Sequence, residues 1–310
     1  MTLSMQTAAP AVSRLSTADL DLLLLIRHFE RGLLDLFGQG RLNGTTHTCL
    51  GQEYVPVALA PLLAERDYVF SNHRGHGHYL ARFGDPAGLL AEIMGRDGAV
   101  CHGVGGSQHI YRDTYLSTGV QGQSLPVATG VAMHLRRRPE PLLAAAYIGD
   151  GTWGEGAVYE ALNMARLWRV PLLVVVEHNG IAQSTPTEAQ MAGTIAGRAA
   201  AFGISHHRVT GIDVNAIRAE LAPLVEQVRH ERLPLVVEFE TYRVGPHSKG
   251  DDSRDDELIR YAEDHDWYRC YERAFPEQFE PADRRQHDLV ARTIAKVAAR
   301  PESTWEPACA

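Results

Sequence analysis

The chain has 310 residues, of which 45% are hydrophobic and 22% charged, and it carries a formal net charge of −8. This composition is ordinary for a folded globular protein and the length allows a large buried core, so extended disorder is not expected. The negative charge argues against nucleic-acid binding, because residues 136–138 form the only tight basic run. The four cysteines have no CxxC spacing, which indicates neither a disulfide framework nor a thiolate zinc site and fits a reducing cytoplasm.

Apolar periodicity and glycine positions predict the elements of the first half of the chain. The apolar run 22–26 is far shorter than the ~20 residues that a membrane-spanning helix needs, so we assign it to a core helix and expect no membrane association. In chain order we expect a flexible N-terminus (1–16) that ends in a helix cap, two helices (17–37 and 51–63), a short strand (67–71), a histidine-rich turn (73–78), an irregular glycine-rich stretch (95–122) and a helix of small residues (124–134). Small residues allow close packing, so the last helix is a candidate contact with another subunit.

The second half of the chain alternates between apolar strands and amphipathic helices. The expected elements are strands at 142–148, 172–177 and 235–239 and helices at 155–168 and 216–229. This alternation predicts an α/β fold with a mostly parallel sheet and helices on both faces. We expect one α/β domain over residues 17–250, followed by a charged helical C-terminal extension over residues 251–310.

Two polar motifs directly follow strands of the predicted βαβ unit. Gly149-Asp150-Gly151 follows the first strand and Asn179 follows the second. The carboxyl ends of neighbouring parallel strands share one edge of a sheet, and the helix that follows the tripeptide points its free N–H groups to the same place. Carboxylate and amide oxygens suit a Mg²⁺ ion that also binds phosphate. The tripeptide alone fits a tight turn with a capping aspartate equally well, and Asn179 is the residue that favours the magnesium site.

Further motifs accompany this pair. They are His47-Thr48-Cys49-Leu50-Gly51-Gln52-Glu53, His73-Arg74-Gly75-His76-Gly77, Gly105-Gly106-Ser107-Gln108-His109 and Tyr242-Arg243-Val244-Gly245-Pro246-His247-Ser248. With these motifs the chain, over residues 20–253, resembles the α subunit of the thiamine diphosphate-dependent decarboxylase (first) component of 2-oxo acid dehydrogenases of the pyruvate, branched-chain and acetoin type. The resemblance implies the thiamine diphosphate-binding fold, in the form that holds the diphosphate and Mg²⁺.

The resemblance also implies roles for individual residues. Asp150, Asn179 and the Ile181 carbonyl are the expected Mg²⁺ ligands, and Arg74 and Arg243 are expected to neutralise the diphosphate, which suits the fixed donor fork of arginine. The other residues expected to contact the cofactor are His73, where many relatives have tyrosine, Gly119, Gln121, Gly149, Gly151, Thr152 and His247.

His47 and His247 match the family histidines near the reactive thiazolium, and we expect them to be the catalytic residues, since imidazole titrates in the useful pH range. The implied activity is decarboxylation of a small 2-oxo acid with transfer of the acyl unit to lipoamide, and the cofactor supplies the carbanion. The activating glutamate is expected on a β subunit with the pyrimidine-binding domain, because residues 251–310 are too few for a second α/β domain. We therefore expect an α2β2 heterotetramer, a lipoyl acyltransferase as the further partner in a complex, and an α chain that is inactive alone.

Two stretches depart from the family pattern. The chain reads Ser253-Arg254-Asp255-Asp256-Glu257 with no later Ser-Asp-Pro turn, and residues 177–183 lack a second asparagine and a tyrosine. A carboligase that passes the acyl unit to a small carbonyl compound therefore stays open as an alternative, and a non-catalytic scaffold as a remote one. A transition-metal site at His73, His76 and His78 is disfavoured, because no carboxylate is interleaved. The sequence does not fix which 2-oxo acid is used.

Overall fold

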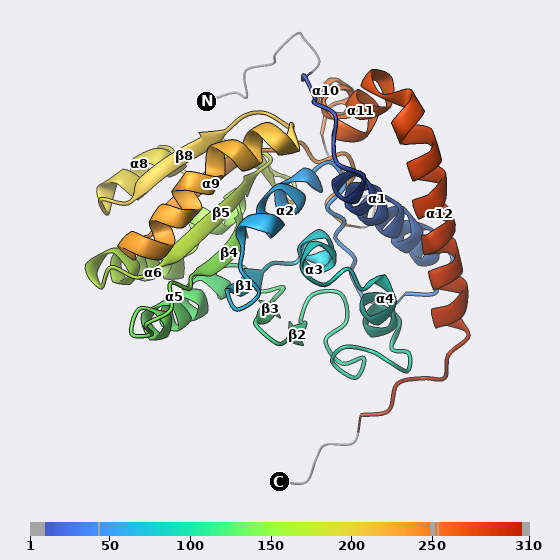
Figure 1. Ribbon diagram of the computed structural model, residues 1–310, viewed down its shortest axis with the longest axis horizontal. Coiled ribbons are helices and arrows are strands. Elements are labelled where there is room, and N and C mark those ends of the chain that lie inside the picture. The colour runs from blue at the N-terminus through green and yellow to red at the C-terminus, as the bar shows by residue number, and fades with distance from the viewer. Residues whose placement is uncertain (1–9, 43, 249–251, 253, 306–310) are drawn as a thin grey trace.

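The computed structural model describes residues 10–42, 44–248, 252 and 254–305 (Figure 1). A seven-stranded sheet lies at its centre, in the order β2-β3-β1-β4-β5-β9-β8. Its strands are β1 (Tyr68–Ser71), β2 (Tyr111–Arg112), β3 (Tyr115–Ser117), β4 (Ala144–Gly149), β5 (Leu172–His178), β8 (Ser205–Val209) and β9 (Leu235–Glu240), and a separate hairpin joins β6 (Ile181–Ala182) to β7 (Thr185–Pro186). Neighbouring strands of the sheet are parallel except for β2 and β3. The predicted α/β fold with a mostly parallel sheet is confirmed.

Helices cover both faces of this sheet (Figure 1). They are α1 (Thr17–Gly38), α2 (Tyr54–Leu59), η1 (Ala60–Leu62), α3 (His76–Phe83), α4 (Pro86–Met94), α5 (Ser124–Leu135), η2 (Asp150–Gly154), α6 (Gly156–Leu167), α7 (Thr187–Gln190), α8 (Ile195–Ala201), α9 (Val214–Glu231), α10 (Asp256–Asp264), α11 (Trp267–Ala274) and α12 (Pro276–Ala298). Buried residues of α1–α4, α9, α11 and α12 form the core on one face, and those of α5, α6 and α8 form the core on the other.

The sequence of β4 is apolar throughout because the strand is buried on both faces of the sheet. Ala145 and Tyr147 belong to the core that the sheet shares with α1–α4 and α9, whereas Ala144, Ala146 and Ile148 belong to the core that it shares with α5, α6 and α8. Each of these side chains is at most 2% exposed. Successive side chains of a strand point to opposite faces, so a strand that is buried on both faces reads as a continuous apolar run.

The N-terminal segment is more firmly held than the sequence suggested. The backbone N–H and the hydroxyl of Ser13 donate to the Asp213 carboxylate at 2.6 and 2.8 Å. The Leu15 N–H donates to the Tyr271 hydroxyl at 2.9 Å, and Ser16 caps α1 as predicted. Residues 1–9 lie outside the described residues. These contacts join residues 13–16 to α9 and α11, and the flexibility expected over residues 1–16 stays a prediction.

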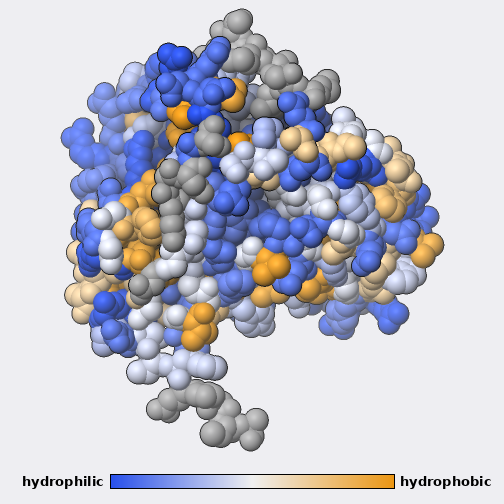
Figure 2. All heavy atoms as spheres, turned by 180° about the vertical axis from the view of Figure 1, so that it is seen from behind, coloured by the Kyte–Doolittle hydropathy of each residue, from blue (hydrophilic) through white to orange (hydrophobic). Residues whose placement is uncertain are grey.

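The C-terminal helices pack against the beginning of the chain. The helix α12 runs beside α1 (Figure 1), and buried residues of α11 and α12 belong to the same core as those of α1–α4. The extension after residue 250 thus shares a core with the α/β domain. Within the described residues, no helix combines the length and the apolar character needed to span a membrane. The reverse face carries scattered hydrophobic groups among hydrophilic ones (Figure 2).

Candidate active site

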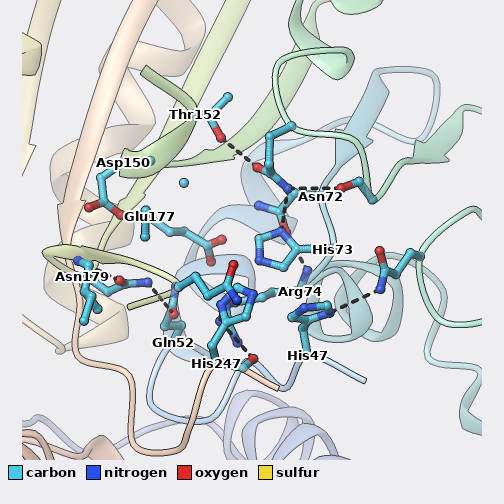
Figure 3. A pocket seen from close by; sticks show the side chains of 18 of the residues that line it. His47, Gln52, Asn72, His73, Arg74, Asp150, Thr152, Glu177, Asn179 and His247 are labelled. Atoms are coloured by element: carbon cyan, nitrogen blue, oxygen red, sulfur yellow. Dashed lines mark hydrogen bonds between the residues drawn. The ribbon is translucent and has the colours of Figure 1, made fainter. Parts of the chain in front are cut away.

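A cavity of about 320 Å³ opens at the edge of the sheet where β1, β4 and β5 end (Figure 3). The segments that follow these three strands supply much of its wall, because the carboxyl ends of parallel strands meet at one edge. Its lining residues are His47, Gln52, Asn72, His73, Arg74, Gln108, Gly119, Gln121, Gly149, Asp150, Gly151, Thr152, Glu155, Glu177, Asn179, Ile181, Ala182, Gln183 and His247. Every residue expected at the site lines this cavity except Arg243.

Asp150 and Asn179 lie at the same end of the cavity (Figure 3). The Asp150 side chain is buried, and its Oδ2 accepts a hydrogen bond from the Thr187 hydroxyl. Asn179 Oδ1 accepts the Ile181 backbone N–H at 3.3 Å, and its Nδ2 donates to Gln52 Oε1 at 3.5 Å. This end therefore offers a carboxylate oxygen, an amide oxygen and a backbone carbonyl, which are the hard ligands that Mg²⁺ prefers.

The backbone between β4 and α6 leaves room for an anion. A Cβ atom added to Gly149 would meet nothing within 4 Å, although Gly149 lines the cavity. A Cβ atom on Gly151 would instead lie 2.6 Å from the Ala182 Cβ, so this glycine allows η2 to pack against β6. The Thr152 hydroxyl donates to Gln121 Oε1 at 2.7 Å. Open space beside a glycine, next to a helix N-terminus, fits a diphosphate group.

Two buried guanidinium groups bring positive charge to the site. Arg74 donates through Nη1 to the Thr48 carbonyl at 2.7 Å and through Nη2 to the His247 carbonyl at 3.2 Å. Arg243 is 2% exposed and donates through Nε to the Gly245 carbonyl at 3.0 Å. Burial and then the charge of Arg243 lower the pKa of Arg74 to about 10. A bound anion would relieve this repulsion.

Asp150 also faces an imidazole. His178 Nε2 lies 3.8 Å from Asp150 Oδ2, and His178 Nδ1 lies 2.7 Å from Glu238 Oε1. Burial opposes the charged form of His178, but the hydrogen bond to Glu238 and the charge of Asp150 outweigh it and raise the pKa of His178. Burial likewise opposes ionisation of Glu238, whereas hydrogen bonds from His178 and His206 lower the pKa of Glu238 to about 2. Ion pairs therefore connect Asp150 in the cavity, through His178 and Glu238, to His206 on the edge strand β8.

Three imidazoles gather at the other end of the cavity (Figure 3). The ring centroid of His47 lies 4.8 Å from that of His73 and 4.6 Å from that of His247. Burial, followed by the charge of Arg74 and the two other histidines, holds the pKa of His73 well below its ordinary value. The two predicted catalytic histidines, which belong to distant motifs, thus meet at one place with His73 beside them.

Seven lining residues were not predicted: Gln52, Asn72, Gln108, Glu155, Glu177, Ala182 and Gln183. Two of them carry a signal in the sequence. Glu177 is an acidic residue near the end of an apolar strand, and its buried carboxylate lies 3.3 Å from His78 Nε2. Asn72 directly follows β1, and its Oδ1 accepts the Arg74 backbone N–H at 2.8 Å. Gln108 belongs to the irregular glycine-rich stretch, where no periodicity predicts the direction of a side chain.

The histidines of the turn after β1 do not form a metal site. His76 Nδ1 lies 3.0 Å from Glu30 Oε2 in the core, and His78 Nδ1 lies 2.7 Å from Ser71 Oγ. His73 alone joins the cavity. The alternative disfavoured from the sequence is thus also unsupported by the geometry.

A buried aspartate and an amide oxygen lie at the ends of adjacent parallel strands near two guanidinium groups, and this set of groups could hold an anionic cofactor together with a divalent cation. Comparison with known proteins gives the family: residues 22–266 match the model described as dehydrogenase E1 component. The pyruvate dehydrogenase E1 component subunit alpha of Rhizobium meliloti (strain 1021) is 37% identical over 251 residues, covering 79% of this chain and 72% of the relative. The corresponding subunit of Zymomonas mobilis (strain ZM4) is 38% identical over 279 residues, covering 88% of this chain and 75% of the relative.

A third relative, the alpha subunit of the acetoin:2,6-dichlorophenolindophenol oxidoreductase of Bacillus subtilis (strain 168), is 34% identical over 251 residues, covering 79% of this chain and 75% of the relative. The chain therefore belongs to the dehydrogenase E1 component family. The predicted resemblance is confirmed. The predicted enzyme class is confirmed with it: the chain is a subunit of an oxidoreductase that decarboxylates 2-oxo acids with thiamine diphosphate. The carboligase and scaffold alternatives gain no support from these relatives.

Proposed function

We propose that this chain forms the diphosphate- and magnesium-binding half of the active site of a 2-oxo acid dehydrogenase. The observation that carries the proposal is the single cavity that unites Asp150, Asn179 and Ile181 with Arg74 and the histidines. Mg²⁺ would be held by the Asp150 carboxylate, the Asn179 amide oxygen and the Ile181 carbonyl. These three groups come from the segments after β4 and β5, whose parallel pairing sets their separation.

The remaining residues of the cavity would bind and orient the cofactor. Arg74 and Arg243 neutralise the diphosphate, and the open space beside Gly149 lets it approach the backbone. Thr152 and Gln121, joined by a hydrogen bond of 2.7 Å, line the cavity and would form part of the wall of the cofactor site. Gly119 and Gly151 complete the lining.

When bound, the cofactor supplies the carbanion that attacks the 2-oxo carbonyl group. We assign to His47 and His247 the binding of substrate charge and the movement of protons at their imidazole nitrogens, since both rings line the cavity and lie 4.6 Å apart. The Arg74 guanidinium, 3.0 Å from His247 Nδ1, fixes the orientation of that ring.

The relatives named above are α subunits, which supports a β subunit as the partner of this chain. That subunit would bring the pyrimidine-binding domain and the activating glutamate, in an α2β2 heterotetramer. Transfer of the acyl unit to the lipoyl group of an acyltransferase completes the proposed reaction. An α chain purified alone is accordingly expected to show no turnover of 2-oxo acids.

Cofactor binding can be tested by thermal denaturation with and without thiamine diphosphate and Mg²⁺, on the α–β complex and on the α chain. Ligand at a hundredfold excess over its dissociation constant stabilises the folded state by about 2.7 kcal/mol, and this gain should require both components. Asp150→Ala should abolish the gain, because it removes a metal ligand.

The matched control is Asp288→Ala, which removes an exposed carboxylate on α12 that has no place in the cavity. It should leave the gain intact. An unchanged Mg²⁺-dependent gain in Asp150→Ala would contradict the assignment.

A further inference from the structure

Each of the three histidines in the cavity meets an N–H donor at the same ring atom. Gln108 Nε2 lies 3.2 Å from His47 Nδ1, and Gln121 Nε2 lies 2.8 Å from His73 Nδ1. Arg74 Nη2 lies 3.0 Å from His247 Nδ1. A guanidinium can only donate, so His247 Nδ1 has to accept.

Second contacts fix the orientation of the two amide groups. Gln108 Nε2 also donates to the Thr45 carbonyl at 3.2 Å, and Gln121 Nε2 also donates to the Gly119 carbonyl at 3.3 Å. Gln121 Oε1 accepts the Thr152 hydroxyl at 2.7 Å. Turning either amide over would place its oxygen against a carbonyl oxygen, so the nitrogen has to face the imidazole.

The tautomers of the three rings follow from these contacts. A neutral imidazole whose Nδ1 accepts a hydrogen bond carries its proton on Nε2. Histidines that bind metal ions show the opposite arrangement, because their second nitrogen donates to a carboxylate or a carbonyl. One nitrogen of each ring lies within 4.8 Å of one nitrogen of each of the other two, but the hydrogen bonds at Nδ1 oppose a metal site there.

We propose that His73 is a substrate-contacting residue whose Nε2–H donates to the carboxylate of a 2-oxo acid, and that Gln121 and Gln108 are positioning residues that hold His73 and His47 in the donor form. His73 lines the cavity, and its Nε2 has no hydrogen-bond partner among the described residues. Burial and the neighbouring charge of Arg74 lower the pKa of His73, which keeps the ring neutral and its tautomer defined at physiological pH.

The inference rests on the proposed function and names the residue that recognises the carboxylate of its substrate. The named relatives include pyruvate dehydrogenase and acetoin oxidoreductase subunits. An N–H donor without a protein acceptor, close to Arg74, favours a substrate that carries a carboxylate over a neutral hydroxyketone.

The tautomer can be measured by long-range ¹H–¹⁵N correlation spectra of the full chain labelled at histidine, with the His73 signal assigned by its loss in His73→Phe. Between about pH 6 and 8, the spectrum should show a neutral ring protonated at Nε2. Gln121→Met removes the donor at similar size and should raise the population of the Nδ1–H form. A ring protonated at Nδ1, or an imidazolium, in the parent protein would overturn the proposal.

The contact with substrate can be tested kinetically in the α–β complex. His73→Phe should raise KM for pyruvate about 10- to 100-fold, because a hydrogen bond to a charged group is lost. The inhibition constant of methyl pyruvate, which lacks the carboxylate charge, should change less than about threefold. His73→Tyr keeps a hydrogen-bond donor, so its KM for pyruvate should lie between those of the parent and His73→Phe. Gln108→Met removes the donor that orients His47, so it should lower kcat with a smaller effect on KM.

Controls separate this proposal from the function on which it rests. The affinity for thiamine diphosphate is measured in each variant and the cofactor is kept saturating, because His73 is also expected to contact the cofactor. His230→Gln, an exposed histidine on α9, should behave as the parent. If the parent complex is active and His73→Phe has the same KM for pyruvate, or if the substitution affects pyruvate and methyl pyruvate equally, the proposed role of His73 is wrong. The proposed function of the chain would then still stand. A parent complex that turns over no 2-oxo acid would instead contradict the proposed function, and the spectra would still report the tautomer.

Discussion

At the scale of single residues, the lack of a Cβ atom at Gly149 leaves open space in the cavity. Gly149 has φ −85° and ψ 163°, a conformation that alanine adopts without strain. Its added Cβ would meet no protein atom within 4 Å, so Gly149→Ala should change the free energy of unfolding by less than about 0.5 kcal/mol. The methyl group would nevertheless occupy space in the proposed diphosphate site, and we expect the dissociation constant of thiamine diphosphate to rise at least about tenfold.

The matched control is Gly154→Ala, at the end of η2, where an added Cβ also meets nothing within 4 Å but the residue does not line the cavity. Isothermal titration calorimetry and urea denaturation of both variants separate binding from stability. Equal affinities of the two variants for the cofactor would show that the diphosphate does not pass Gly149.

Local structure predicted only part of the site, and the family resemblance supplied the histidines and arginines from distant motifs. Asp150 and Asn179 each follow a strand of an apolar βαβ unit, so the geometry of a parallel sheet alone brings them together. Gln108 reaches His47 only because a loop folds over residues that lie far away in the sequence. No local pattern encodes such a contact. The amide contacts that define the histidine tautomers could not be predicted from the sequence for the same reason.

At the scale of elements, a buried charge network joins α1 to the C-terminal helices and to the loop before α2. Arg27 Nη1 and Nη2 lie 2.6 and 2.7 Å from the two Asp266 oxygens, and Arg27 Nε lies 2.5 Å from Glu53 Oε1. Glu53 Oε2 accepts the Gly51 N–H and the Trp267 indole N–H, both at 2.8 Å. Removing one partner of a buried ion pair leaves the other charge without compensation.

Asp266→Ala should therefore lower the free energy of unfolding by about 3–5 kcal/mol, measured by urea denaturation. Asp264→Ala, which removes an exposed carboxylate two residues earlier, is the control and should change it by less than about 0.5 kcal/mol. If Asp266→Ala were as stable as the control, the ion pair would not be what fastens α11 to α1.

Most elements with a strong apolar pattern were predicted to within a few residues, although the apolar helix α4 (Pro86–Met94) was not, and several elements without such a pattern were missed. The strands β4, β5 and β9 are buried on both faces, which their sequences show directly. The edge strand β8 reads Ser-His-His-Arg-Val, and its polar side chains pair with acidic groups of β9. The helix α3 begins inside the histidine- and glycine-rich turn, so its start resembles a loop. In both cases tertiary contacts provide what local pattern lacks.

At the scale of the whole molecule, two apolar side chains in and just before the first turn of α5 are exposed in the described part of the chain. Val120, between the lining residues Gly119 and Gln121, is 49% exposed, and Val127, in the first turn of α5, is 47% exposed. The small residues of α5 led to the sequence-based expectation that this helix meets another subunit, and we predict that its exposed surface contacts the β subunit.

Val127→Glu tests this assignment. A carboxylate buried without a partner in an interface costs several kcal/mol, so the dissociation constant of the α–β complex should rise at least about a hundredfold. The variant chain should fold normally, because residue 127 is on the surface. The control is Leu167→Glu, which places the same charge on a residue that is 68% exposed at the end of α6. This residue precedes β5 and so lies toward the amino ends of the strands, away from the cavity. The variant should assemble as the parent does. Co-purification with the β chain and light scattering distinguish the outcomes. Normal assembly of Val127→Glu would place the β subunit on another face, while loss of assembly in both variants would point to a general effect of charge.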